Sequence, residues 1–350
     1  QWPGQDGRFG QQAGPFGYAA QQGGPFPQYG GAPVPPRRRR PSPLKFLAAL
    51  FGTFTIMVLA YVLLSYGGNG SSSDGSSGSR NGSYANEDYE VPPADTSPSE
   101  IPQPETYSEA TQWMEDNPVY GASVAEPVRC DLDALDMSTA TDAQLEDHLN
   151  ELTACLMRVW GPTLRDAGYE AVRPTVTVYD SEISTPCGDM PMGNAAYCMV
   201  DQQVYYATDL AEVVPDELSG VPYTADAVMA HEFGHAVQAR TGILYSEKAW
   251  ESRVGSSQAD EFSRRTEVQA DCFAGEFIGS VSESLALTPS DTDGLSQMFY
   301  AFGDDALTGD SSYRGSHGHG TNRREWFQDG LDDRSLATCN AFTAADSRVR

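Results

Sequence analysis

Basic side chains are scarce in this chain. Its 350 residues include 22 Lys and Arg against 49 Asp and Glu, and residues 67–350 alone hold 16 basic and 48 acidic residues. So acidic a region would repel the phosphates of a nucleic acid, which excludes nucleic acid as a partner. The acidity is compatible either with a preference for basic substrates or simply with solubility.

The chain also lacks any C-x-x-C pair, although it has six cysteines. Such pairs are the usual ligands of structural zinc sites, so zinc bound by cysteine is not expected. An even number of cysteines favours disulfides formed in an oxidising compartment. We expect three of them: Cys130 with Cys155, Cys187 with Cys198, and Cys272 with Cys339.

Residues 1–43 are rich in Gln, Gly and Pro and poor in aliphatic side chains, which predicts a disordered cytoplasmic tail. Residues 44–66 contain an uncharged run, Phe46 to Leu64, long enough to cross a bilayer as a helix. Arginines 37–40 precede it, so the sequence predicts a transmembrane signal-anchor helix and a single-pass cell-membrane localisation with the N-terminus inside. A Gly-, Ser- and Pro-rich linker, 67–106, would join it to an extracytoplasmic domain, 107–350.

Only five histidines occur, and two of them lie four residues apart in the run His231-Glu232-Phe233-Gly234-His235. Residues 225–240 contain no Pro and one Gly, and Thr224 precedes them as a candidate N-cap, which predicts a helix. Both rings would then leave the same helix face and reach one metal ion. This H-E-x-x-H pattern predicts His231 and His235 as zinc ligands with Glu232 beside the open coordination position. The alternative is an ordinary helix with two structural histidines.

A second predicted helix, about 258–281, offers a third ligand. Glu267 would complete a set of two histidines and one glutamate. Asp271 lies one turn further along the same face, where it could accept a hydrogen bond from the non-ligating nitrogen of a zinc-bound histidine. A solvated acidic helix face is the alternative, but the residues after Asp271 are small or apolar and favour close packing.

With this second motif the chain resembles the bacterial neutral zinc metallopeptidases, in which an E-x-Q-A-D-C-[FY]-A-G stretch follows H-E-x-x-H. That stretch is Glu267 to Gly275 here. The resemblance covers about residues 187–330 and implies zinc as the cofactor. It includes these further segments: Cys187-Gly188, Asn194 to Cys198, Gly303-Asp304-Asp305, His317-Gly318 and Trp326-Phe327. The chain departs from the family at Ala236, where a histidine is common, and at residues 318–323.

Zinc held by His231, His235 and Glu267 would lower the pKa of its bound water from about 16 toward about 7. Glu232 would accept that water's proton and pass it to the leaving amine. The negative charge that develops on the peptide carbonyl also needs a donor, for which His317 is our candidate. The competing donors are Tyr197, Tyr205 and Tyr206.

Two other interpretations of His317 stay open: an inert Gly-rich surface loop, or a second metal site formed with His319. His148, beside the apolar stripe of another helix, is expected to be structural. That helix has a capping box at Thr141 to Gln144 and is predicted to end at Gly161-Pro162.

Residues 174–179 and 199–206 alternate as strands do. The order helix, strands, motif helix, glutamate helix predicts an α+β, zincin-like metallopeptidase domain behind the transmembrane helix and linker. The sequence thus predicts a membrane-anchored zinc peptidase acting on a peptide or protein substrate.

The alternative function is a catalytically silent, zinc-stabilised domain that binds a cell-envelope or protein partner. Glu232 argues against it, because proton transfer needs this residue and metal binding does not. A zinc hydrolase of another amide, such as one in the cell wall, would use the same ligands.

Overall fold

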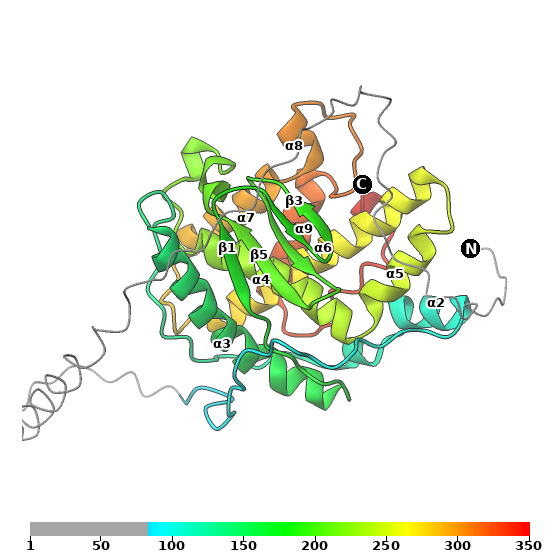
Figure 1. Cartoon of the computed structure of the whole chain (residues 1–350), viewed down its shortest axis with the longest axis horizontal. Coiled ribbons are helices and arrows are strands. Elements are labelled where there is room, and N and C mark those ends of the chain that lie inside the picture. The colour runs from blue at the N-terminus through cyan, green and yellow to red at the C-terminus, as the bar shows by residue number, and fades with distance from the viewer. Residues whose placement is uncertain (1–82) are drawn as a thin grey trace, which may run out of the picture. The chain divides into compact units, whose positions relative to one another are not determined.

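The structure is a computed structural model and describes residues 83–350 (Figure 1). These residues form eight α-helices, five strands and four short 3-10 helices. In chain order the elements are α2 (Tyr107–Glu115), η1 (Pro118–Gly121), α3 (Asp142–Asp166), β1 (Val176–Tyr179), β2 (Ile183–Thr185), β3 (Gly188–Met190), β4 (Ala195–Cys198), β5 (Gln203–Ala207), η2 (Thr208–Glu212), η3 (Asp216–Leu218), α4 (Thr224–Arg240), α5 (Ile243–Glu251), α6 (Ser256–Val281), α7 (Pro289–Ala301), α8 (Asp304–Thr308), α9 (Gly320–Asp332) and η4 (Asp346–Arg348).

A three-stranded sheet in the order β1-β5-β4 forms one layer of the fold. β5 pairs in parallel with β1 and antiparallel with β4, so β4 is an edge strand. Successive β5 side chains face opposite sides of the sheet. Val204 and Tyr206 join the main core, whereas Tyr205 and Ala207 pack in a smaller cluster with Met190 of the β2–β3 hairpin. The hairpin therefore covers the face of the sheet that is turned away from the main core.

The helices form the other layer: α3 and α4 pack on the sheet, α6 packs on α4, and α9 packs on α6 (Figure 1). Two glycines allow the backbones of α6 and α9 to touch. A Cβ atom added at Gly275 would lie 2.1 Å from the Phe327 carbonyl oxygen, and one at Gly330 would lie 2.0 Å from the Cys272 carbonyl oxygen. Side chains of α9 are thereby placed directly against the predicted glutamate helix.

Helix α4 begins one residue earlier than the sequence predicts, because Thr224 belongs to the helix. Tyr223 is the N-cap, with φ 61°, and the Thr224 hydroxyl donates to the Val221 carbonyl oxygen instead of capping the helix. Almost every side chain of α4 is buried. Its last residue, Arg240, donates hydrogen bonds to Ser99 and Glu170, which attaches the end of this helix to two distant segments.

Other predicted elements also differ from the structure; the first predicted strand, 174–179, is β1, Val176–Tyr179. α3 has the predicted capping box at Thr141 but continues through Pro162 to Asp166, since Thr163 and Leu164 still pack in the core. The predicted strand 199–206 is instead β5, Gln203–Ala207, because residues 199–202 form a turn in which Gln202 has φ 57°. β4 lies in what the sequence indicated as a loop.

The structure contains three disulfides, and they are the three pairings expected from the sequence: Cys130–Cys155, Cys187–Cys198 and Cys272–Cys339. The second connects the β2–β3 turn with the end of β4. The third connects the middle of α6 with the C-terminal segment. The domain boundary drawn at Tyr107 stays a prediction, although Ala85 and Tyr89 already pack against the core.

The predicted membrane anchor needs correction. Within residues 83–350, no helix combines the length and the apolar character required to cross a bilayer. The longest helices, α3 and α6, carry charged side chains along their whole length. The α+β part of the fold class agrees with the structure, but we withdraw the transmembrane helix, the single-pass localisation and the extracytoplasmic placement. The proposed span, 44–66, and the tail, 1–43, lie outside the described residues.

Candidate metal centre

Helices α4 and α6 bring His231, His235 and Glu267 together. One ligand atom from each residue lies within 4.8 Å of the other two, the only such group among residues 83–350. Glu267 Oε2 is 3.4 Å from His231 Nε2, and Glu267 Oε1 is 3.5 Å from His235 Nε2. Ligands about 2.0–2.2 Å from a tetrahedral zinc ion stand about 3.3 Å apart, so these separations fit a shared zinc ion.

The outer nitrogen of each imidazole faces a hydrogen-bond acceptor. His231 Nδ1 lies 2.8 Å from Asp271 Oδ1, and His235 Nδ1 lies 2.8 Å from Gln238 Oε1. His235 Nδ1 is hydrogen-bonded, while His231 Nδ1 has the Asp271 carboxylate in contact without an aligned hydrogen bond. An acceptor beside Nδ1 favours the ring proton there and leaves the Nε2 lone pair free for a metal. Both Nε2 atoms point at Glu267. The residues present therefore suit zinc in separation, donor type and tautomer.

Glu267 supplies the negative charge of the group. Burial alone would raise the pKa of its carboxyl, but His235 and His231 beside it hold that pKa well below its usual range. Glu267 is therefore ionised at neutral pH, as a carboxylate ligand must be.

Arg323 of α9 is a member of the site that the sequence analysis did not identify. Its Nε and Nη2 atoms donate to Asp271 Oδ2 and Oδ1 over 2.9 and 2.8 Å, and Nη2 also lies 4.0 Å from Glu267 Oε2. Both Asp271 and Arg323 are buried. A chain of contacts thus runs from Arg323 through Asp271 to His231, and it fixes the orientation of that ring.

Glu232, the residue between the two histidines, is held by the edge strand. Its Oε2 atom accepts a hydrogen bond of 2.8 Å from the Tyr197 backbone N–H of β4. Tyr197 lies opposite Val204 of β5, but its N–H points to the other side of β4 and donates to Glu232 instead of to β5. The strand that the sequence analysis missed therefore positions the predicted general base.

His317 lies close enough to Glu267 for the two charges to interact, and its side chain is 58% exposed. Its Nδ1 atom is 3.5 Å from Asp304 Oδ1, and its backbone N–H donates to Asp304 Oδ2. The contact with Asp304 and the charge of Glu267 raise the pKa of His317. A protonated imidazole is thus stabilised beside the predicted ligands.

The three tyrosines considered as competing donors have other surroundings. Tyr206 is fully buried, with its hydroxyl 3.4 Å from Met137 Sδ, and the Tyr205 hydroxyl donates to Asp201. Burial raises the pKa of Tyr197, whose side chain interacts with the charge of Arg240. Of the four candidates, His317 alone combines exposure with proximity to Glu267.

The remaining histidines have structural contacts. His319 Nε2 lies 2.8 Å from the Tyr313 carbonyl oxygen, and its Nδ1 is 3.7 Å from Asp305. His148 Nε2 lies 3.1 Å from Asp226 Oδ2, which links α3 to the first turn of α4. His317 and His319 therefore contact different acids, Asp304 and Asp305.

Comparison with known proteins agrees with this geometry. The sequence profile of the family described as "Putative neutral zinc metallopeptidase" matches residues 125–342, more than half of the chain. The chain belongs to this family. The match contains both ligand helices, Glu232, Asp271 and Arg323.

This member of the zinc metallopeptidase family is similar in sequence to two bacterial proteins. The uncharacterized protein Rv2575 of Mycobacterium tuberculosis H37Rv is 31% identical over 208 residues, which are 54% of this chain and 67% of that protein. The uncharacterized protein YpfJ of Escherichia coli K12 is 29% identical over 216 residues, 59% of this chain and 75% of that protein. No solved structure matches the chain.

Proposed function

We propose that the protein is a zinc-dependent peptidase in which His231, His235 and Glu267 hold the metal and Glu232 is the general base. The observation that carries this proposal is the convergence of three ligand atoms from two helices, with Glu232 fixed next to them by the Tyr197 N–H. A silent metal-binding domain would need the ligands but not a positioned carboxylate between them.

A bound zinc ion would supply a Lewis acid that polarises a peptide carbonyl and acidifies water. Each residue then has a separate task. Glu232 Oε2 stays hydrogen-bonded to Tyr197, so Oε1 accepts a proton from the attacking water and later delivers it to the leaving amine. Asp271 keeps the proton of His231 on Nδ1, so that Nε2 remains a ligand.

His317 serves in this proposal as the hydrogen-bond donor to the carbonyl oxygen. Asp304 contacts its Nδ1 atom and leaves Nε2–H to face the substrate. A donor of this kind contributes only when negative charge develops, so replacing His317 with Gln should lower kcat about 100- to 1,000-fold with little change in zinc content.

Metal analysis of the full chain, run beside a peptide cleavage assay, tests the proposal. We expect one zinc per chain in the wild type and in Glu232→Gln, and much less in Glu267→Ala. Glu232→Gln should lose about 10²- to 10⁴-fold in cleavage of a quenched-fluorescent peptide library. Glu283→Gln, which changes an exposed glutamate, is the matched control. Undiminished cleavage by Glu232→Gln, or a wild type without zinc, would contradict the proposal.

A further inference from the structure

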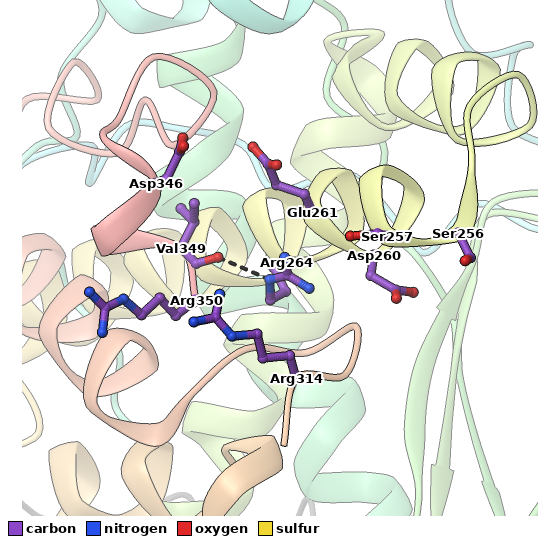
Figure 2. A pocket seen from close by; sticks show the side chains of 9 residues that line it. All are labelled: Ser256, Ser257, Asp260, Glu261, Arg264, Arg314, Asp346, Val349 and Arg350. Carbon is purple, nitrogen blue, oxygen red and sulfur yellow. Dashed lines mark hydrogen bonds between the residues drawn. The ribbon is translucent and has the colours of Figure 1, made fainter. Parts of the chain in front are cut away.

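A second polar site lies along helix α6, one turn before Glu267. It is a pocket of about 310 Å³ between the N-terminal half of α6, the loop before His317 and the C-terminal segment (Figure 2). Its charged lining consists of three acids and three arginines: Asp260, Glu261, Asp346, Arg264, Arg314 and Arg350.

Two of the three acids are already paired. Glu261 Oε1 lies 2.9 Å and Asp346 Oδ1 lies 3.1 Å from Nη2 of the buried Arg265. Within residues 83–350, Asp260 is the one lining acid without an ion pair. Both acids share the single charge of Arg265, so four arginines, counting Arg265, face three acids around the pocket.

The arginines are not engaged in the same way. Arg264, which is buried, donates from Nε to the Val349 carbonyl oxygen and from Nη1 to that of Gly315, so Nη2 remains available. Arg314 and Arg350 are exposed. Of all Lys and Arg side chains in residues 83–350, these two have no hydrogen bond, ion pair or aromatic contact. Unpaired cations are unexpected in so acidic a domain, and both of these line one pocket.

The pocket and the metal centre share one face of α6. Asp260, Arg264 and Glu267 follow one another at spacings of four and three residues, which places them along one stripe of the helix. Along the helix axis, Arg264 lies about 4.5 Å before Glu267, and Ser256, at the far end of the pocket, lies about 16 Å before it. The loop of His317 adjoins it, since a Cβ atom at Gly318 would be 3.8 Å from Arg264 Cδ.

We infer that this pocket binds a carboxylate of the peptide substrate through Arg264, Arg314 and Arg350. The inference rests on the proposed peptidase function and adds the substrate class: peptides with a carboxylate about one to four residues from the cleaved bond, given about 3.3 Å per extended residue. Guanidinium groups suit this ligand because they hydrogen-bond both carboxylate oxygens. The carboxylate belongs either to an acidic side chain or to a free C-terminus.

Matched quenched-fluorescent peptides test the inference with the full chain. Acetylated, amidated peptides carry Glu or Gln at one of the four positions on either side of the cleaved bond, and a further set carries Gln with a free C-terminus. Their kcat/KM values are compared for the wild type, Arg314→Gln, Arg350→Gln and the double variant. Arg129→Gln, a surface arginine paired with Glu87, is the control. Binding of the same peptides is measured by fluorescence anisotropy.

In the wild type, we expect kcat/KM for a carboxylate-containing peptide to be about 10-fold higher than for its neutral partner. The double variant should have equal kcat/KM for the two peptides, whereas Arg129→Gln should keep the wild-type ratio. Asp260→Asn should raise the ratio, because it removes the one unpaired acid. The favoured peptide set distinguishes a side-chain carboxylate from a C-terminal one. Equal kcat/KM for all peptides, or a preference that survives in the double variant, would overturn the inference alone. If the wild type cleaves none of the peptides but still binds the carboxylate-containing ones more tightly in the anisotropy measurement, the peptidase proposal is refuted and the carboxylate site is kept.

Discussion

Helix α6 carries two buried acids that each face an arginine from the α9 region, and the two pairs differ. Asp271 receives two hydrogen bonds from Arg323, of 2.9 and 2.8 Å, and its Oδ1 also contacts His231. Glu276 lies 3.5 Å from Arg334 Nη1, and its Oε2 atom has no hydrogen-bond partner among the described residues. Burial is the same in both cases, but hydrogen bonding is complete in only one.

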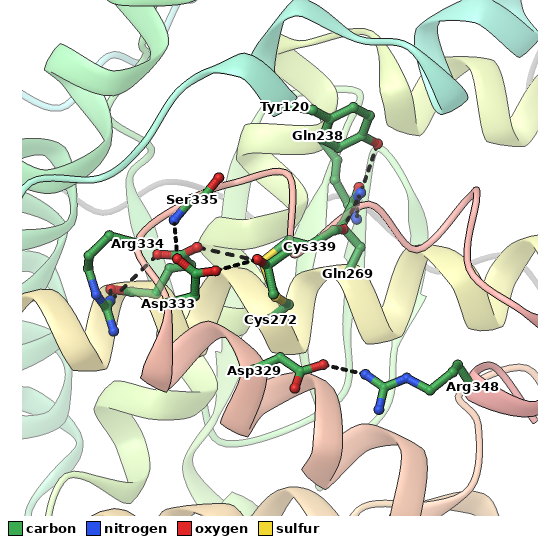
Figure 3. Close-up of a disulfide and its surroundings, with 12 residues drawn as sticks. Tyr120, Gln238, Gln269, Cys272, Asp329, Asp333, Arg334, Ser335, Cys339 and Arg348 are labelled. Carbon is green, nitrogen blue, oxygen red and sulfur yellow. Dashed lines mark hydrogen bonds and ion pairs between the residues drawn. A yellow bond between two sulfur atoms is a disulfide. The ribbon is translucent and has the colours of Figure 1, made fainter.

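The donors of Arg334 are used elsewhere. Its Nη1 donates to the Glu276 backbone carbonyl oxygen, and its Nε lies 3.0 Å from Glu126 Oε2. Arg334 lies near the Cys272–Cys339 disulfide, in the segment that closes over α6 (Figure 3). Burial raises the pKa of Glu276 to about 8, against the attraction of Arg334. The comparison shows that the hydrogen bonds of Asp271, the acid beside the proposed metal ligand His231, are complete, whereas Glu276 is left to hold a proton.

Breaking the first pair should have the largest effect. Arg323→Met would leave Asp271 buried without its cation, which costs about 3–5 kcal/mol of the free energy of unfolding. Because Asp271 orients His231, zinc affinity should also fall about 10- to 100-fold. Urea unfolding and competition with a zinc chelator measure the two effects.

Arg334→Met is the matched change in the second pair. Near neutral pH, Glu276 already holds a proton, so loss of its arginine leaves no buried negative charge, and we expect a smaller loss of stability and an unchanged zinc affinity. If Arg323→Met and Arg334→Met lower the free energy of unfolding and the zinc affinity by equal amounts, the two acid–arginine pairs have the same role.

The contrast between these pairs also shows what a sequence can reveal about such a site. His231, His235, Glu267 and Asp271 were identifiable because helix geometry fixes which residues share a face at spacings of four. Arg323 follows Asp271 by 52 residues and reaches it only through the packing of α9 on α6. The available indication was indirect: a buried aspartate between apolar neighbours needs a cation, and Arg323 lies between the His317 and Trp326 segments of the family pattern.

The fold was predictable to a similar degree. Three of the helices, α3, α4 and α6, were evident from caps or apolar spacing, and β1 from its alternation, whereas α2, α5, α7, α8 and α9 were not predicted. β4 was not predicted, because its residues, Ala195–Cys198, do not alternate between polar and apolar side chains and follow Gly193-Asn194. Yet this strand holds Glu232. The local sequence of β4 therefore does not predict this part of the site, which becomes evident only from the pairing of β4 with β5 in the structure.

Removing the charge of Glu276 should sharpen the comparison through its dependence on pH. The folded state raises this pKa from 4.5 to about 8, so the folded protein favours the protonated form. The stability that goes with that form is complete below pH 4.5 and is lost as the pH rises toward 8. Glu276→Gln stays neutral, and it should match the wild type at pH 4.5 and exceed it by about 4 kcal/mol at pH 8.

Urea unfolding across this pH range measures the difference. Glu283→Gln, an exposed change just beyond α6, should show no such trend. A Glu276→Gln variant that is less stable than the wild type at pH 8 would mean that Arg334 keeps Glu276 ionised, and the two pairs would then be alike.

The smallest effect is expected from the support of the second histidine. His235 faces the neutral oxygen of Gln238, whose Nε2 donates to the Thr266 carbonyl oxygen, whereas His231 faces a carboxylate backed by an arginine. Gln238→Leu removes the one neutral hydrogen bond to the His235 ring, worth about 1 kcal/mol, so zinc affinity should fall about fivefold. Asp271→Asn, which removes a charge, should cost about 10- to 100-fold. Chelator competition on both variants and on Gln238→Glu, which restores an acceptor at His235, separates the two contributions. If Gln238→Leu weakens zinc binding as much as Asp271→Asn does, the orientation of the rings rather than the charge behind them sets the affinity.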